Sequence, residues 1–177
     1  MIAHSRRTFL GTLAAAVPLI AAPCRLLAES TGRALRFAHT HTGERLAIEY
    51  FSGGTYLADA LTTVNHFLRD FRTGEVHAID PGLLDLLHRV ATATGTSRPF
   101  EVISGYRSPA TNEMLRHRSE GVAAGSLHMQ GQAIDIRLRD VALPKLRQAA
   151  LEARRGGVGY YPASDFVHVD TGRVRTW

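Results

Sequence analysis

Two histidines and one aspartate are spaced so that they could hold one metal ion. His128 lies shortly before Gly131, Asp135 lies on the polar side of an alternating stretch, and His168 lies in a β-like segment near the end of the sequence. Two imidazoles and a carboxylate suit a catalytic zinc ion, which takes three protein ligands and keeps a fourth position for water. A glycine at position 131 allows the tight turn that would return the chain to the same ion.

The same residues have structural interpretations. The chain contains 9 histidines, so a pair of them beside an aspartate can arise by chance. His128 could hydrogen-bond its own turn, and Asp135 could form an ion pair with Arg107 or Arg137. His39 and His41 share one side of a predicted strand, and we interpret them as surface residues. Residue types alone therefore leave the metal site as one of two hypotheses.

Hydropathy patterning predicts the elements that position these residues. Alternation of polar and apolar residues predicts short strands at 35–39, 46–51, 100–103, 133–138, 157–161 and 166–170. Apolar residues three and four apart predict helices over 56–71, 110–117 and 143–154. Another helix begins with Asp80 as N-cap and Pro81 in its first turn, and ends at Gly95.

The order of these elements predicts the fold class. Helices and hairpins alternate without a regular βαβ repeat, which favours an α+β fold with a mainly antiparallel sheet and flanking helices. The sequence shows no internal repeat and no second composition regime. We therefore expect residues 29–177 to form one domain.

Residues 1–28 have the pattern of an export signal. The segment Ser5-Arg6-Arg7-Thr8-Phe9-Leu10 matches the twin-arginine motif. The apolar stretch at 10–22 is shorter than the ~20 residues of a membrane span, although an N-terminal anchor is the alternative. We expect export through the twin-arginine translocase to the periplasm, and no stable membrane span in the mature protein.

Composition excludes several classes of protein. The chain of 177 residues has a single cysteine, which excludes a disulfide scaffold and a cysteine-rich zinc module. Its net charge is +5, but without the three arginines of the leader the remainder carries 18 basic and 16 acidic residues. Because the folded part is nearly neutral, we expect no nucleic-acid partner.

Three motifs resemble those of a known superfamily. Ser126-Leu127-His128-Met129-Gln130-Gly131-Gln132-Ala133-Ile134-Asp135 is similar to the SxHxxGxAxD signature of the D-Ala-D-Ala metallopeptidase branch of the lysostaphin, D-Ala-D-Ala peptidase and hedgehog superfamily. Ser104-Gly105-Tyr106-Arg107-Ser108 resembles its arginine-bearing segment, and Asp165-Phe166-Val167-His168 its acid-x-x-His segment.

Three further segments, at 65–70, 79–83 and 156–161, resemble the murein endopeptidase K family. The resemblance covers essentially all of the chain after the leader. It implies the hedgehog/DD-peptidase fold, a single zinc ion held by His128, Asp135 and His168, and cleavage of peptide cross-links in peptidoglycan, including bonds between two meso-diaminopimelate residues.

The resemblance also implies roles for other residues. Asp165 corresponds to the family's general base. Strand alternation, however, places Asp170 on the same face as His168, so Asp170 is the rival candidate for the base. Alternatively, Asp170 orients a ligand imidazole or pairs with Arg173. Arg107 would supply a positive charge to a substrate carboxylate or an oxyanion. Substrate contacts are expected from Ser126, which could instead cap its loop, and from Tyr106, which could instead pack.

Two other functions remain open at this point. The same zinc site would serve a D,D-carboxypeptidase or dipeptidase that acts on free D-Ala-D-Ala ends. A peptidoglycan-binding module without catalysis is the alternative from a different class of protein.

Overall fold

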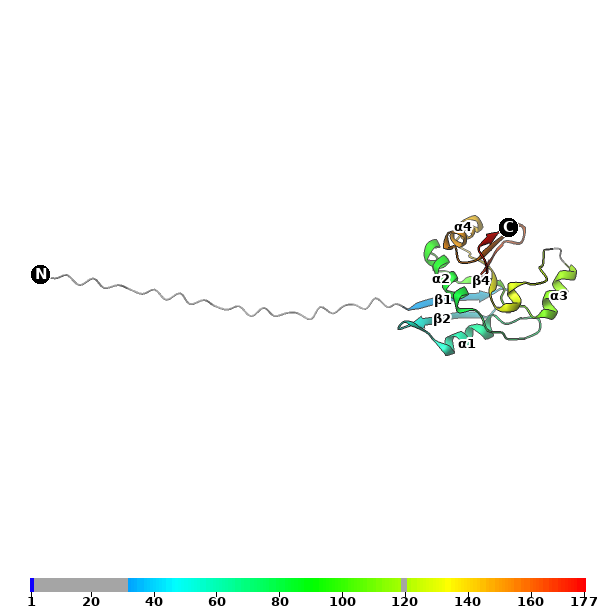
Figure 1. Cartoon of the computed structure of the whole chain (residues 1–177), viewed down its shortest axis with the longest axis horizontal. Helices are drawn as coiled ribbons and strands as arrows, with labels where there is room; N and C mark the ends of the chain where they lie inside the picture. The colour runs from blue at the N-terminus through cyan, green and yellow to red at the C-terminus, as the bar shows by residue number, and fades with distance from the viewer. Residues whose placement is uncertain (2–31, 119–120) are drawn as a thin grey trace.

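The computed structural model describes Met1, residues 32–118 and residues 121–177. Apart from Met1, the predicted export signal at 1–28 lies outside these residues. The described chain forms one sheet of eight strands with four α-helices around it (Figure 1). The strands are β1 (Arg33–His39), β2 (Arg45–Ser52), β3 (Thr55–Tyr56), β4 (Phe100–Ser104), β5 (Ala133–Arg137), β6 (Gly157–Tyr161), β7 (Phe166–Asp170) and β8 (Arg175–Thr176).

The sheet is mixed, in the order β3-β2-β1-β4-β5-β7-β6-β8. Five of its seven pairings are antiparallel, and the β1–β4 and β6–β8 pairings are parallel. The predicted α+β class is therefore confirmed. The parallel pairings were not predicted, because hydropathy alternation identifies a strand but does not identify its neighbour.

The helices are α1 (Ala58–Phe67), α2 (Pro81–Thr94), α3 (Pro109–Arg118) and α4 (Leu143–Ala153). The predicted limits of α2 are confirmed, because Asp80 accepts a hydrogen bond from the Gly82 N–H and Gly95 adopts a left-handed conformation. The helix predicted over 56–71 is shorter than expected. Tyr56 pairs with Phe51 of β2 at one end, and at the other the Leu68 carbonyl accepts the Tyr106 N–H instead of continuing the helix.

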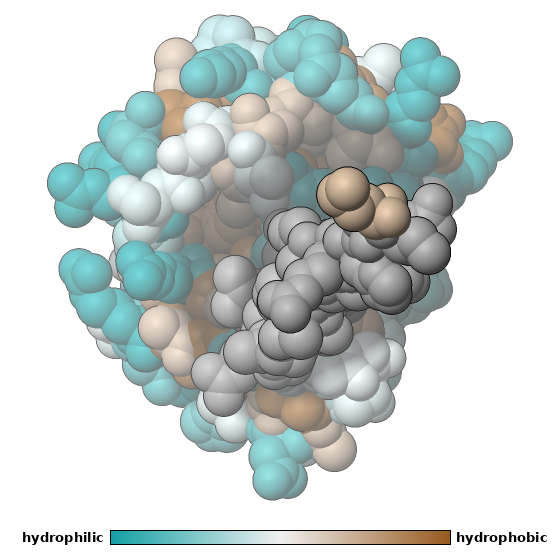
Figure 2. All heavy atoms as spheres, turned by 90° about the vertical axis from the view of Figure 1, so that its left-hand side faces the viewer, coloured by the Kyte–Doolittle hydropathy of each residue, from teal (hydrophilic) through white to brown (hydrophobic). Residues whose placement is uncertain are grey.

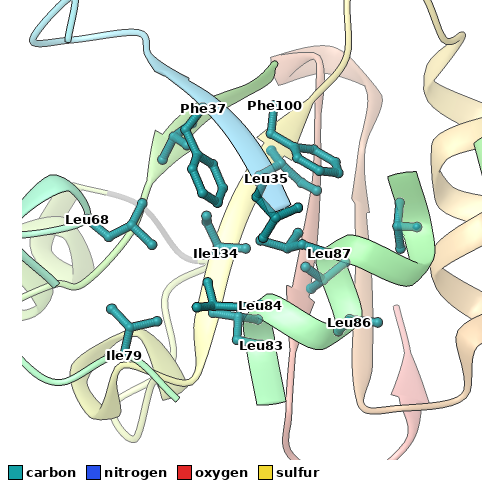
Figure 3. Packing of buried hydrophobic residues seen from close by; sticks show 14 of the residues in the cluster. Leu35, Phe37, Leu68, Ile79, Leu83, Leu84, Leu86, Leu87, Phe100 and Ile134 are labelled. Carbon is teal, nitrogen blue, oxygen red and sulfur yellow. The ribbon is translucent and has the colours of Figure 1, made fainter. Parts of the chain in front are cut away.

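A single hydrophobic core joins one face of the sheet to α1, α2 and α4. The leucines of α2, among them Leu83, Leu84 and Leu87, point toward Leu35 of β1 and Ile134 of β5 (Figure 3). Because side chains alternate along β5, Ile134 and Ile136 enter this core while Asp135 faces the other side of the sheet. The core thus places the candidate metal ligand on the sheet face opposite α2.

One face of the molecule is largely polar. On the face seen in Figure 2, hydrophilic residues predominate and apolar residues are scattered among them. None of the helices in the described parts of the chain is long and apolar enough to cross a bilayer.

One interpretation from the sequence is wrong, because His39 is a core residue. His39 is only 3% exposed and packs against Phe67 and Phe71. Its Nδ1 accepts the backbone N–H groups of His41 and Thr42, so the ring closes the hairpin turn. Strand β1 ends at His39, and His41 stacks on Phe71 with ring centroids 4.3 Å apart.

Candidate metal centre

Three elements bring His128, Asp135 and His168 together. His128 lies on a short 3-10 helix, η1 (Leu127–Gln130), Asp135 on β5 and His168 on the adjacent strand β7. Asp135 and His168 are direct cross-strand partners. Gly131 ends η1 with a φ of 65°, and a side chain there would collide with the Ala78 carbonyl, 2.1 Å from an ideal Cβ. The turn after His128 therefore requires glycine.

One donor atom of each residue faces the other two. His128 Nε2 lies 3.2 Å from His168 Nδ1 and 3.3 Å from Asp135 Oδ1, and His168 Nδ1 lies 2.9 Å from Asp135 Oδ1. Ligand atoms of a tetrahedral zinc site with bonds of about 2.0–2.1 Å lie ~3.3 Å apart. Among the described residues this is the one group of at least three histidine, cysteine or acidic side chains that meets metal-ligand spacing.

The remaining ring nitrogens fix which atoms are free for a metal. His128 Nδ1 donates to the Gly105 carbonyl over 2.7 Å. Because a carbonyl can only accept, the hydrogen of the neutral ring lies on Nδ1, and Nε2 keeps a lone pair for a metal. His168 Nε2 lies 3.1 Å from Asp170 Oδ2, which leaves Nδ1 facing Asp135. Such hydrogen bonds orient metal-binding imidazoles in known sites. The donor set therefore fits a single divalent ion.

The pKa values of the cluster follow from its packing. Burial lowers the pKa of His128. Burial alone would lower the pKa of His168 too, but its contacts with Asp135 and Asp170 outweigh this and raise the pKa. Burial likewise works to raise the pKa of Asp135, but His128, His168 and Arg107 hold it well below its usual range. The contacts between these residues thus favour the charged forms of both His168 and Asp135.

Arg107 contacts the metal-site carboxylate directly. Its guanidinium donates to Asp135 Oδ2, and its Nε donates to Ser104 Oγ over 2.9 Å. This leaves Asp135 Oδ1 for a metal and places a positive charge on the wall of the site. The ion pair between Arg107 and Asp135, which the sequence left as an alternative to metal binding, coexists with the ligand arrangement.

Asp170 lies behind His168 and not in the open part of the site. Its carboxylate is 0% exposed. It accepts hydrogen bonds from the backbone N–H groups of Gly157 and Gly172, from both terminal nitrogens of Arg175, and from His168 Nε2. Burial alone would raise the pKa of Asp170, but these donors lower it. The arginine partner is Arg175, not Arg173.

Asp165 lies on the same face as the metal ligands, contrary to simple alternation. It precedes β7 and has a φ of 53°, so the strand pattern does not extend to it. Its carboxylate lies 3.1 Å from Arg137, whose side chain shares a face with Asp135 two residues earlier. The Asp165 side chain is 63% exposed. It is not among the residues that line the metal cleft, although Ser164 and Phe166 on either side of it are.

The two predicted substrate-binding residues have different positions. Ser126 lines the cleft, and its hydroxyl accepts the His128 N–H over 3.4 Å, so it also caps η1. Tyr106 is buried, stacks on His77 with ring centroids 4.8 Å apart, and does not line the cleft.

The ligands open into a cleft of about 460 Å³. Its lining includes most of the segment from Gly121 to His128 and the aromatic residues Tyr161, Phe166 and Trp177. Sequence reasoning did not identify Trp177. Its position in the sequence carries no motif, and only the β6–β8 pairing brings it to the site.

The segments at 65–70 and 79–83 hold the loops that carry the site. Asp70 accepts hydrogen bonds from the backbone N–H and the hydroxyl of Ser108, the residue after Arg107. Asn65 accepts the Ile79 N–H, and Asp80 both caps α2 and accepts the Thr171 hydroxyl. These polar residues therefore position ligand-bearing segments and do not themselves touch the metal cluster.

Three converging ligand atoms in an open cleft form the kind of site found in enzymes that bind one catalytic metal ion and keep a position for water. The family model described as "Peptidoglycan L,D-endopeptidase MepK" matches residues 28–177. The chain therefore belongs to this family, which stands in the peptidase group M15.

Individual relatives agree with the family match. The chain is 50% identical over 145 residues to "Peptidoglycan L,D-endopeptidase MepK" of Escherichia coli K12, which covers 82% of this chain and 80% of that protein. It is 45% identical over 146 residues to "Probable peptidoglycan L,D-endopeptidase MepK" of Haemophilus influenzae, which covers 82% of this chain and 78% of the relative.

Proposed function

We propose that this protein is a zinc-dependent endopeptidase that hydrolyses peptide cross-links between the stem peptides of peptidoglycan, including 3-3 links between meso-diaminopimelate residues, during cell wall turnover. The observation that carries the proposal is the orientation of His128 Nε2, Asp135 Oδ1 and His168 Nδ1 toward one point in an open cleft. Family membership supplies the substrate class. The resemblance adds the hedgehog/DD-peptidase fold for residues 29–177.

A zinc ion bound there would lower the pKa of a water molecule and polarise the scissile carbonyl. His128, Asp135 and His168 would hold the ion, and Asp170 fixes the orientation of the His168 ring. Arg107 holds the Asp135 carboxylate and would supply a positive charge to the carbonyl oxygen of a bound substrate. Ser126 fixes the backbone of η1 and, at the cleft wall, is available to hydrogen-bond the substrate.

We assign the general base to Asp165 and not to Asp170. Asp165 is exposed, lies on the metal-ligand face and has only Arg137 as a charged partner among the described residues. Asp170 is buried on the far side of the His168 ring with its lone pairs occupied by donors. Asp165 would accept a proton from the attacking water and return it to the leaving amine.

Export follows from the substrate. Peptidoglycan lies outside the cytoplasm, and we propose that residues 1–28 direct the protein through the twin-arginine translocase to the periplasm.

The decisive experiment is digestion of purified muropeptide dimers, with 3-3 and 4-3 cross-links in separate reactions, with chelator and with zinc added back. We expect conversion to monomers that requires the metal. His168→Ala should abolish conversion and metal binding, whereas His117→Ala, a matched change on exposed α3, should leave both unchanged. Trimming of stem ends without loss of the cross-link would identify a carboxypeptidase, and retention on sacculi without products a binding module.

The base assignment has its own test. Asp165→Asn should lower kcat by about 100-fold or more at unchanged zinc content, with the exposed Asp59→Asn as control. Asp170→Asn should instead weaken zinc affinity by about 10–100-fold. Full activity of Asp165→Asn would remove Asp165 from the mechanism.

A further inference from the structure

Trp177 is the sole tryptophan of the chain, and its indole ring lies at the metal cleft. The ring centroid lies 5.3 Å from that of His168. The backbone is anchored on both sides, because the Trp177 N–H donates to the Val158 carbonyl and the Trp177 carbonyl accepts the Tyr160 N–H. The side chain is thus attached to the sheet edge and not to a loose tail.

Gly159 leaves the space in which the indole lies. An ideal Cβ at Gly159 would be 2.8–2.9 Å from three indole atoms of Trp177, closer than real side chains approach. Gly159 is the cross-strand partner of His168, so the ring covers the strand directly beside a metal ligand. One side of the ring packs on the sheet while the residue as a whole remains 48% exposed.

The Tyr161 hydroxyl is oriented by Trp177. The indole Nε1–H donates to this hydroxyl over 2.8 Å. Because an indole N–H only donates, the hydroxyl acts as acceptor in this bond and keeps its own hydrogen for another partner. Within residues 32–118 and 121–177 that hydrogen has no acceptor. The Tyr161 ring is itself fixed by stacking on Phe166, with centroids 4.6 Å apart.

We propose that Tyr161 and Trp177 form a substrate subsite beside the metal. The open part of the indole contacts the aliphatic side chain of the diamino acid next to the scissile bond, and the Tyr161 hydroxyl donates its hydrogen to an oxygen of the same residue. An aromatic surface combined with one oriented donor matches a long aliphatic chain that carries polar ends. This inference rests on the proposed function and adds to it the residues that select the substrate.

Kinetics of the zinc-loaded protein on cross-linked dimers test the hydroxyl. Tyr161→Phe keeps the ring and its stacking, and should raise KM by about 3–10-fold with kcat within about 2-fold, the range expected for one hydrogen bond. Tyr160→Phe is the matched control, since this neighbouring tyrosine packs against the core on the opposite face of β6. Equal KM values for the two variants would overturn the role of Tyr161.

The single tryptophan allows a second measurement that does not depend on turnover. Titration of the zinc-loaded wild-type protein with monomeric product, and separately with uncleaved dimer at low temperature, should give a saturable change in tryptophan emission. Tyr161→Phe should raise the dissociation constant of the dimer by the same factor as it raises KM. Trp177→Phe should bind more weakly than wild type in a competition assay, with unchanged zinc content and circular dichroism.

The outcomes separate this inference from the proposed function. Cleavage of dimers with unchanged emission, or with wild-type KM in both Tyr161→Phe and Trp177→Phe, would overturn the subsite and leave the endopeptidase intact. A failure to cleave dimers would instead refute the proposed function, and absence of an emission change on adding dimer would then refute the subsite as well.

Discussion

The Asp70 carboxylate holds the end of the arginine-bearing loop through Ser108. It accepts the Ser108 N–H over 2.9 Å, the Ser108 hydroxyl over 2.7 Å and the Arg72 N–H over 3.0 Å. Both Asp70 and Ser108 are buried. Replacement of Asp70 by alanine would leave the buried Ser108 donors without partners, each at a cost of about 1–3 kcal/mol.

We therefore expect Asp70→Ala to lower the free energy of unfolding by about 3 kcal/mol at neutral pH. For a domain of this size the melting temperature should fall by roughly 10 °C. Because Ser108 follows Arg107, which holds the Asp135 carboxylate, the variant should also bind zinc more weakly. Urea unfolding followed by circular dichroism measures the first effect, and zinc titration measures the second. Asp59→Ala, an exposed change in α1, should cost less than about 1 kcal/mol.

The pH dependence gives an independent check. Burial alone would raise the pKa of Asp70, but hydrogen bonds from Thr111 and Ser108 lower it below its ordinary value of 3.8. A carboxyl with a lowered pKa in the folded state stabilises the protein above its ordinary pKa, and this stabilisation is lost as pH falls toward the folded-state value. The difference in the free energy of unfolding between wild type and Asp70→Ala should therefore shrink as the pH falls over that range. An unchanged urea midpoint in Asp70→Ala, or a difference independent of pH, would refute the reasoning.

Burial lowers the pKa of His39 from 6.5 to about 4. Between these pH values the unfolded chain therefore binds more protons at His39 than the folded protein does. The free energy of unfolding of the wild type should fall by up to about 3 kcal/mol from pH 6.5 to 4. Urea titrations of His39→Leu should not show this fall in the free energy of unfolding. Thermal melts should show zinc adding about 4 kcal/mol of stability at a thousandfold excess over its dissociation constant, an effect that His168→Ala abolishes and His117→Ala retains. Gly159→Ala should displace the Trp177 ring and shift its emission, and an unshifted spectrum would contradict the close packing described above.

Local features of the fold followed from the sequence because they depend on neighbouring residues. The Asp80 cap, the Pro81 start and the Gly95 end of α2 are decided by backbone groups within one turn of each residue. The early C-terminal end of α1 could not be predicted, because the Leu68 carbonyl accepts a hydrogen bond from Tyr106, a residue distant in the sequence. The burial of His39 likewise depends on α1 packing over β1, which a strand pattern does not report.

For the site, the motif resemblance was enough to predict the three candidate donor residues, which residue types alone had left as one of two hypotheses, and the structure brings their donor atoms together. The positions of the neighbouring side chains could be read only from the tertiary structure. The left-handed conformation of Asp165 places its carboxylate on the ligand face, and the alternation of β7 places Asp170 behind His168. The β6–β8 pairing brings Trp177 over Gly159. Such placements depend on strand order and on single backbone torsions, which hydropathy and spacing do not specify.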